Sequence, residues 1–245
     1  MASTTTNFPP VTPHGGLETI FDNMYIVEGS YDMAMGMMIG RTMTIYKNGD
    51  DLVILNSIRV NEAVEKDILE LGQIKHLVRM CEAHGLDDPY YIDKFKPTYW
   101  GLDTFKAING PNGPLQHDKM LQEGDTPIPN MKVVTIKSGK ECTLWIPDHG
   151  GTVIACDLVQ NMTEIPIHAS WFGGKITKWG GFMGECTCAP PLWKILHGKD
   201  HKHAIQNILS WDFENLFTAH GSAKVGGAKP LCEKHFAASL GDPNA

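Results

Sequence analysis

The chain has 245 residues, 42% of them hydrophobic and 20% charged, as expected for a folded protein with a sizeable core. The formal net charge is -7 and no run of Lys and Arg occurs, which argues against a nucleic-acid partner. No apolar stretch approaches the roughly 18 residues of a membrane span, and the first residues do not resemble a signal peptide. We therefore expect a cytoplasmic protein that binds a small molecule, with no nucleic-acid or membrane partner, and leave a homodimer open.

Six cysteines are present, and none of their spacings forms a C-x-x-C pair. Cys81, Cys142 and Cys156 lie within apolar runs. Cysteines in such runs are usually buried free thiols, and free thiols are typical of a reducing compartment. The cysteine pattern therefore predicts neither a disulfide framework nor a zinc ribbon.

The N-terminal part of the chain predicts strands. Residues 1–16 are rich in Ser, Thr, Pro and Gly and are expected to form a flexible segment, followed by a single domain over 17–245. Apolar β-type runs predict a first strand near 20–27 and two more at 42–46 and 52–55. Asn48-Gly49 between the last two is a strong hairpin signal.

A strand–helix–strand unit is predicted next. Asn61 is a good N-cap for a one-sided apolar helix over 62–71, and Gly72 is expected to end that helix in the left-handed conformation. Residues 74–80 then read as a buried strand, so part of the sheet should be parallel.

The remaining elements follow in order. Pro, Gly and Asn in residues 97–130 predict long loops with one short strand, a connection long enough to cover a site. The other predicted elements are a short helix at 89–95, strands at 131–136, 142–146 and 152–156, helical stretches at 193–196 and 205–209, a strand ending at 218, and a helix at 228–240.

Polar residues with metal-binding potential follow three of the apolar runs. They are His84, Asp157 and His220, and Asp87 and Asp88 lie close to the first of them. Each has an ordinary structural explanation when taken alone. Asp88 before Pro89 is a turn signal, Asp157 suits a helix N-cap, and His220 before Gly221 suits a strand end.

Five motifs in a fixed order carry a family resemblance. They are RTMTI at 41–45, LVILNSI at 52–58, LGQIKHLV at 71–78, IACD at 154–157 and AHG at 219–221. The chain resembles the metallo-β-lactamase fold superfamily and, within it, a poorly characterised lactamase-fold group of unknown function. The resemblance implies an α/β fold, a four-layer αβ/βα sandwich in which two mixed β-sheets are flanked by helices.

The resemblance also implies a metal site with an altered ligand set. The family's metal loop reads H-x-H-x-D-H, and residues 81–88 keep only His84 and the adjacent aspartates. By resemblance, His84, Asp88, Asp157 and His220 are metal ligands, and Glu141 lies near the place of a missing histidine. Asp87 and Asp88 would be the catalytic carboxylates, acting as base or orienting groups. Nitrogen and oxygen ligands of this kind suit zinc or iron, and we expect one ion or none.

Three functions are consistent with these residues. The first is a hydrolase in which metal-activated water attacks an ester, thioester, lactone or amide-like bond. The second is a lactamase-fold protein without a working metal that binds an apolar small molecule, with the methionines of 33–38 as a candidate groove. The third is a redox or oxygen enzyme with a single iron. Aromatic residues beside glycines at 171–182 suggest either a lid over the site or close helix packing.

Overall fold

The computed structural model describes residues 8–33, 36–136, 138–197 and 201–241. The first seven residues of the predicted flexible segment, and Met35 of the predicted methionine groove, lie outside the described residues. Residues 8–16 run alongside strand β2 (Met24–Asp32). Gly15 donates a hydrogen bond to the Glu28 carbonyl, and Ser30 donates one to the Pro13 carbonyl.

Within these described ranges, seven strands form the larger sheet, in the order β1-β2-β3-β4-β5-β6-β9. The first four pair antiparallel and the last four pair parallel, so the sheet is mixed. Besides β2, its members are β1 (Glu18–Phe21), β3 (Met38–Asn48), β4 (Asp51–Leu55), β5 (Gln73–Val78), β6 (Thr98–Gly101) and β9 (Lys119–Met120).

A second mixed sheet comes from the C-terminal half. Its order is β10-β11-β12-β15, and only β12 and β15 pair parallel. The strands are β10 (Lys132–Thr135), β11 (Cys142–Ile146), β12 (Thr152–Ala155) and β15 (Asn215–Thr218), with the short helix η1 (Asp148–Gly150) between β11 and β12. Two small antiparallel pairs are β7 (Ile108–Gly110) with β8 (Gly113–Leu115), and β13 (Val159–Met162) with β14 (Gly184–Cys188).

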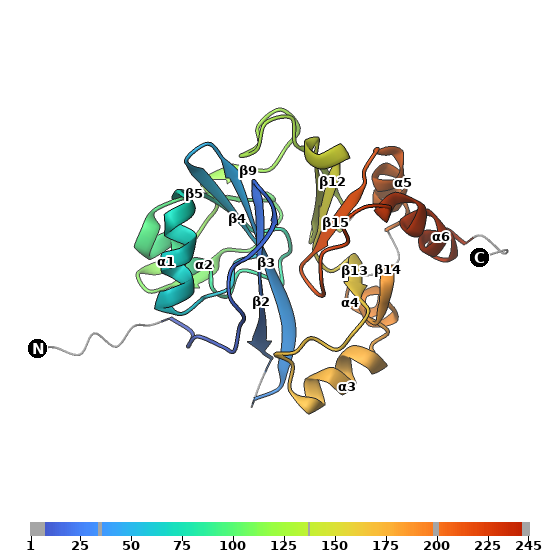
Figure 1. The fold of residues 1–245 in the computed structure, drawn as a ribbon, viewed down its shortest axis with the longest axis horizontal. Coiled ribbons are helices and arrows are strands. Elements are labelled where there is room, and N and C mark those ends of the chain that lie inside the picture. Colours follow the sequence, from blue (N-terminus) through green and yellow to red (C-terminus); the bar gives the residue numbers. More distant parts are fainter. Residues whose placement is uncertain (1–7, 34–35, 137, 198–200, 242–245) are drawn as a thin grey trace, which may run out of the picture.

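The two sheets face each other and helices cover their outer sides (Figure 1). Helices α1 (Glu62–Leu71) and α2 (Asp88–Phe95) cover the larger sheet, and α5 (Lys202–Ser210) and α6 (Ala228–Leu240) cover the smaller one. Helices α3 (Trp171–Trp179) and α4 (Pro191–His197) lie at the lower end of the molecule in this view. The predicted four-layer αβ/βα sandwich with two mixed sheets is confirmed.

Strand β4 shows how the layers are held together. Val53 and Leu55 belong to the core between the sheets, which also contains Phe217 of β15. Leu52 and Ile54 belong to the core beneath α1 and α2. Both sides of the strand are buried because successive side chains point to opposite faces of a sheet. Each fully buried Leu, Ile or Val contributes about 1.5–3 kcal/mol relative to an exposed one.

Helix α1 has the predicted bounds, but it ends differently from the prediction. The Asn61 side chain accepts a hydrogen bond from the Val64 amide at 3.0 Å, as expected of an N-cap. Gly72 has φ 160, which is extended rather than left-handed. A Cβ at Gly72 would lie 2.3 Å from the Asp50 carbonyl oxygen, so the close approach of the β3–β4 turn is what requires glycine.

The connection over 97–130 is more regular than predicted. It contains β6, β7, β8 and β9 instead of one short strand. Three of these strands have only two or three residues, and two of the three include Gly or Pro, so they are too short for periodicity to reveal them.

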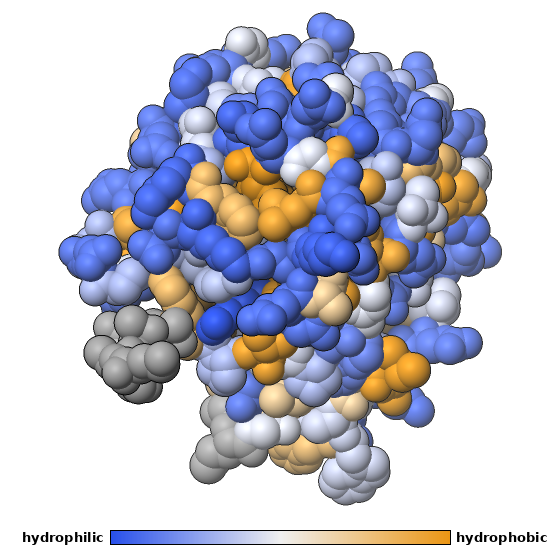
Figure 2. Space-filling model, turned by 60° about the vertical axis from the view of Figure 1, so that its left-hand side comes forward, coloured by the Kyte–Doolittle hydropathy of each residue, from blue (hydrophilic) through white to orange (hydrophobic). Residues whose placement is uncertain are grey.

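The surface seen in Figure 2 is mostly hydrophilic, with apolar side chains in smaller patches between the polar ones. Among the helices of the described residues, none has both the length and the apolar composition needed to span a bilayer.

Candidate metal centre

Parallel pairing of β12 with β15 brings Asp157 and His220 together. Ala155 lies opposite Thr218 at the ends of these strands, and the Ala219 amide donates to the Ala155 carbonyl at 3.1 Å. Asp157 and His220 each lie two residues beyond the end of their strand. Because parallel strands end at the same edge of a sheet, two side chains that are 63 positions apart (220 − 157) become neighbours.

The loop that carries His84 is fixed by Arg79, which follows β5 and is 4% exposed. Its guanidinium donates hydrogen bonds to the backbone carbonyls of Cys81, Glu82, His84 and Lys106. The planar guanidinium holds several acceptors in a set geometry. Arg79 therefore fixes the path of the loop, which places the His84 side chain next to the ends of β12 and β15.

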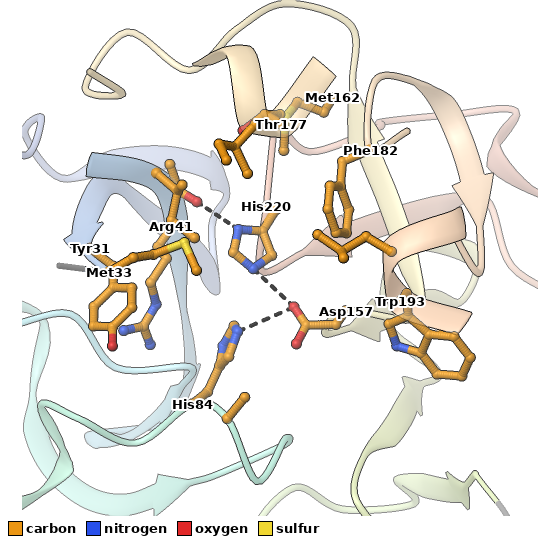
Figure 3. A pocket seen from close by; sticks show the side chains of 15 residues that line it. Tyr31, Met33, Arg41, His84, Asp157, Met162, Thr177, Phe182, Trp193 and His220 are labelled. Carbon is orange, nitrogen blue, oxygen red and sulfur yellow. Dashed lines mark hydrogen bonds and ion pairs between the residues drawn. The ribbon is translucent and has the colours of Figure 1, made fainter. Parts of the chain in front are cut away.

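His84, Asp157 and His220 converge on one point (Figure 3). Asp157 Oδ1 lies 3.2 Å from His84 Nε2 and 2.9 Å from His220 Nε2, and the two imidazole rings meet edge to face. Two ligands bound to one zinc or iron ion at 2.0–2.2 Å, at angles near tetrahedral or octahedral values, lie about 3 Å apart. The two histidine–carboxylate distances therefore match the spacing of ligands around a single ion, and all three ligand atoms lie within 4.8 Å of one another.

The Gly40 carbonyl sets the tautomer of His220. It lies 2.6 Å from His220 Nδ1, and because a carbonyl only accepts hydrogen bonds, Nδ1 carries the proton. The lone pair of a neutral His220 is then on Nε2, which points at Asp157 Oδ1. Two acceptors at 2.9 Å require a cation between them, either a proton or a metal ion. A backbone carbonyl on the other ring nitrogen is a common support for a metal-binding histidine.

The protonation states also suit metal binding at neutral pH. Burial lowers the pKa of His84 to about 4, against the opposing influence of Asp157, so this imidazole is neutral above about pH 5. Burial alone would raise the pKa of Asp157, but the electrostatic influence of His84 and the hydrogen bonds with His220 and His84 hold it well below its usual range. The site therefore offers one carboxylate and a neutral His84.

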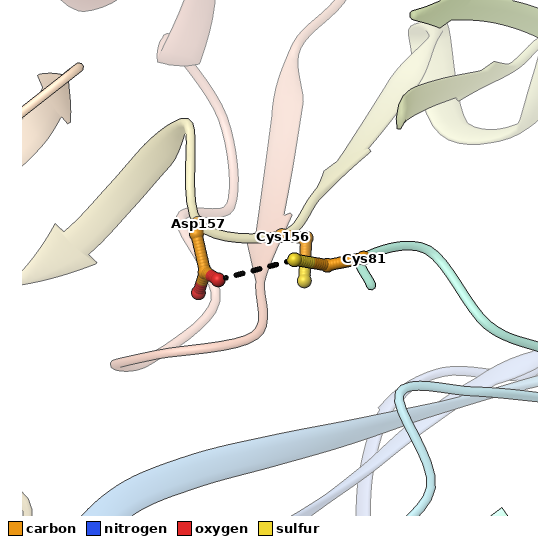
Figure 4. Close-up of side chains that lie close together, drawn as sticks. All are labelled: Cys81, Cys156 and Asp157. Carbon is orange, nitrogen blue, oxygen red and sulfur yellow. Dashed lines mark hydrogen bonds between the residues drawn. The ribbon is translucent and has the colours of Figure 1, made fainter. Parts of the chain in front are cut away.

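Two cysteines complete the surroundings of Asp157 (Figure 4). Cys81 Sγ lies 3.4 Å from Asp157 Oδ2, and Cys156 Sγ lies 3.3 Å from His84 Nδ1. Burial raises the pKa of the Cys156 thiol well above its usual value, so it remains a thiol that orients His84. The sequence interpretation placed both cysteines in the core and missed their contact with the site. Sequence proximity could have indicated this contact, because Cys156 directly precedes Asp157 and Cys81 lies three residues before His84.

Asp87 and Asp88 lie apart from this group. Asp88 is 1% exposed, and its carboxylate oxygens accept hydrogen bonds from Ser57 Oγ at 2.6 Å and from the Tyr99 hydroxyl at 2.7 Å. Neither aspartate lines the cavity that contains His84, Asp157 and His220. Both carboxyl groups are buried, and burial raises the pKa of each. Asp88, at the start of α2, is thus bound to Ser57 and to Tyr99 of β6, and it helps to hold α2 on the larger sheet.

Glu141 lies behind Asp157, fully buried at the start of β11. Its two oxygens accept hydrogen bonds from the Leu158 amide at 2.6 Å and the Trp193 indole at 3.0 Å. Burial and the nearby charge of Asp157 raise its pKa to about 8. Its contacts make it a support for the segment that presents Asp157, and it is not in the group that converges with the histidines.

A cavity of about 190 Å³ opens onto the three converging side chains. Its lining is mainly apolar, with Met33, Met162, Ile176, Phe182 and Leu192 among its residues. Arg41, which is 4% exposed and donates to the Ser57 carbonyl, supplies the positive charge of the wall. The segment 171–182, one of whose predicted roles was a glycine-rich lid, forms helix α3 and contributes Ile176 and Phe182 to this wall.

Gly221 is the residue whose replacement should disturb the site most directly through the backbone. It has φ 94, and a Cβ would lie 2.1 Å from the Asn161 carbonyl oxygen. Gly221→Ala is expected to cost about 2–5 kcal/mol of unfolding free energy, from backbone strain and overpacking together, and to displace His220. Chemical denaturation and metal titration of the refolded protein measure the two effects.

Gly226→Ala is the matched control, because Gly226 also has positive φ but has no atom within 4 Å of the Cβ position. This variant should lower the free energy of unfolding by only about 1 kcal/mol and leave metal uptake unchanged. Equal losses for the two variants would contradict a specific role for the Gly221–Asn161 contact.

No protein-family model matches the chain, and no curated protein sequence matches it. Solved structures do match. VMB-1 is 12% identical with a TM-score of 0.62, covering 94% of this chain and 98% of that one. The metallo-β-lactamase FIM-1 from Pseudomonas aeruginosa, in a mono-zinc form, is 14% identical with a TM-score of 0.56, covering 94% and 99%. A flavoprotein from Thermotoga maritima is 13% identical with a TM-score of 0.62, covering 93% of this chain and 62% of that one.

Proposed function

We propose that this chain, which has the metallo-β-lactamase fold, is a metal-dependent hydrolase that holds one zinc or iron ion between His84, Asp157 and His220. The substrate would be a small molecule with a largely apolar body and an ester, thioester, lactone or amide-like bond. When bound, the ion would polarise the scissile carbonyl and lower the pKa of a water molecule.

The main support for this proposal is that two hydrogen-bond acceptors, His220 Nε2 and Asp157 Oδ1, face each other in the site. The Gly40 carbonyl directs the lone pair of a neutral His220 toward Asp157 Oδ1, only 2.9 Å away. A divalent ion would satisfy His220, Asp157 and the neutral His84 at once. Without an ion, both histidine–carboxylate contacts need a proton on Nε2 of His84 and a further proton on Nε2 of His220. Two histidines and one carboxylate are also a ligand set found in zinc hydrolases.

The surrounding residues have separable tasks in this proposal. Arg79 fixes the His84 loop, Cys156 orients the His84 ring, and Glu141 supports the segment after Asp157. Ile176 and Phe182 would exclude water and bind the apolar body of the substrate. The guanidinium of Arg41 would favour the negative charge that develops on the carbonyl oxygen during attack.

A second candidate is oxygen or redox chemistry at a single iron. Two histidines and one carboxylate with open positions are the ligand set of non-haem iron oxygenases. A flavoprotein is among the proteins with a similar fold, although it aligns over only 62% of its length. The metal that restores activity distinguishes the two candidates.

The experiment begins with protein purified without a chelator and without metal-affinity chromatography. Its metal content is measured by elemental analysis, before and after chelation and after addition of zinc or ferrous iron. Hydrolysis is then followed with chromogenic esters of short and long acyl chains, a thioester, a lactone and a β-lactam. We expect about one ion per chain, loss of hydrolysis on chelation, and recovery with the native metal. Oxygen uptake that requires iron would favour the second candidate.

A folded protein that takes up neither metal would contradict both metal-dependent functions. The apolar cavity would then support the third interpretation, a protein that binds an apolar small molecule without catalysis. Fluorescent fatty-acid or steroid-like probes that bind the wild type and His220→Ala with equal affinity would identify that outcome.

A further inference from the structure

Helix α3 exposes its aromatic residues and buries its small ones. Trp171, Phe172 and Trp179 are 76%, 54% and 81% exposed. The buried positions include Gly173, where a Cβ would lie 1.8 Å from the Met38 carbonyl oxygen. The helix packs closely on β3 through this glycine side. Surface helices normally turn their apolar stripe toward the core, so this arrangement requires an explanation.

Apolar residues next to the helix enlarge the exposed area. Ile165 and Ile167, immediately before α3, are 49% and 82% exposed, and Ile195 on α4 is 78% exposed. Ile165 packs beside the helix, since a Cβ at Gly174 would lie 2.9 Å from its side chain. Monomeric proteins rarely leave large apolar side chains grouped in this way unless they bind something. We call Ile165, Ile167, Trp171, Phe172 and Trp179 the α3 surface.

Helix α3 itself carries two lysines and no acidic residue, whereas Glu164 precedes Ile165 and Glu28 lines the same groove as Ile165 and Ile167. Between positions 165 and 199 the sequence has one acidic residue, Glu185, and its carboxylate is paired with Lys224 at 2.8 Å. Lys175 and Lys178 lie on the same exposed side of α3 as the tryptophans, at i+4 and i+7 from Trp171. The Lys175 ammonium lies 3.7 Å from the centre of the Trp171 ring.

We propose that the α3 surface docks on the headgroup region of membranes that contain anionic lipids. Tryptophan side chains favour the interface between water and hydrocarbon, and lysine stems extend along apolar surface while their ammonium groups reach phosphate. Helices that anchor peripheral proteins in the interface combine Trp or Phe with Lys or Arg, and the exposed residues of α3 have this composition. In a symmetric dimer formed through α3, the lysines of both copies would share one interface, which disfavours a second copy as the occupant.

The same helix forms part of the wall of the candidate site. Ile176 and Thr177 of α3, with Phe182 just after it, line the cavity that contains His84, Asp157 and His220. Docking would therefore place the apolar cavity beside the bilayer, where an amphiphilic ester or thioester is concentrated. This consequence for the substrate rests on the proposed function, whereas the docking itself does not. No membrane partner was expected from the sequence, because an apolar stripe on a helix normally faces the core, and only the structure shows that α3 packs through its glycines.

Sedimentation with lipid vesicles tests the docking. Metal-loaded full-length protein is mixed with vesicles of phosphatidylcholine alone or of phosphatidylcholine with phosphatidylserine. We expect binding to the anionic vesicles, weakened by salt, and a blue shift of tryptophan fluorescence. The double variant Trp171→Ala/Trp179→Ala and the double variant Lys175→Gln/Lys178→Gln should each lower the partition coefficient on the order of tenfold or more.

Leu69→Ala and Lys66→Gln on α1 are matched controls, because both residues are exposed on a helix that covers the larger sheet, away from α3 at the lower end of the molecule (Figure 1). They should bind vesicles as the wild type does. Circular dichroism and hydrolysis of a water-soluble ester establish that every variant is folded, independently of docking. Failure of the wild type to bind anionic vesicles would overturn the proposal. Dimers that disappear in the Trp171→Ala/Trp179→Ala variant would also overturn it, by assigning the α3 surface to a second copy.

Discussion

Replacing His220 with alanine is expected to lower the affinity for zinc at least 100-fold and to abolish metal-dependent hydrolysis. His220 supplies one of the three nitrogen and oxygen ligands of the proposed site, and its loss leaves His84 and Asp157 of that group. Loss of a mere supporting residue already costs 10–100-fold in affinity at many sites, so loss of a ligand should cost more. Competition with a chromogenic chelator measures the affinity, and elemental analysis measures the stoichiometry.

His84→Ala and Asp157→Asn should show the same loss, because each removes another member of the group. His203→Ala is the control, since His203 lies exposed on α5 beside Asn207. It should keep the metal content and the activity of the wild type. A His220→Ala protein that still binds one equivalent of zinc with unchanged affinity would contradict the proposed ligand set.

Glu141→Gln is expected to remove most of a pH dependence of stability between about pH 5 and pH 8 in the metal-free protein. Burial and Asp157 raise the pKa of Glu141 from 4.5 to about 8. The folded state therefore holds a proton on Glu141 that the unfolded state releases near pH 4.5. The folded state binds more protons across this interval, so the free energy of unfolding falls as pH rises from about 5 to 8. A shift of this size corresponds to at most about 5 kcal/mol.

Urea unfolding of the metal-free wild type and the variant from pH 5 to pH 9 measures this effect as a difference. Other buried groups titrate in both proteins, so the difference isolates Glu141. Glu185→Gln is the control, because Glu185 is only partly buried and the hydrogen bond from Lys224 lowers its pKa, which keeps its titration below this interval. Parallel stability curves for the wild type and Glu141→Gln would show that Glu141 is ionised in the folded state throughout.

The long elements of this fold were predictable because their signals are local. The helix over 62–71 follows from a capping asparagine and a one-sided apolar pattern, and the structure gives the same bounds. The parallel pairing of β4 with β5 follows from the strand–helix–strand order. The strands at 108–110, 113–115 and 119–120 were missed because so few residues show no periodicity.

The site residues also differ in how far the sequence could identify them. His84, Asp157 and His220 attracted attention as polar residues after apolar runs, and the family resemblance linked them. Asp88 attracted the same attention, but its carboxylate binds Ser57 and Tyr99. Both types of aspartate follow a strand in the sequence. Only the three-dimensional path of the loop, which Arg79 imposes through backbone carbonyls, separates a converging side chain from a buried structural one.

The sequence by itself determined most of the longer strands and helices, the three polar residues after apolar runs and, through the family resemblance, the two mixed sheets. These depend on periodicity, capping and motif order, which neighbouring residues express along the chain. The tertiary structure alone decided that β12 and β15 pair in parallel, that the Gly40 carbonyl orients His220, and that α3 turns its tryptophans outward. Each of these is a contact or an exposure set by segments far apart in the chain, and no local pattern of side chains encodes a backbone carbonyl's position.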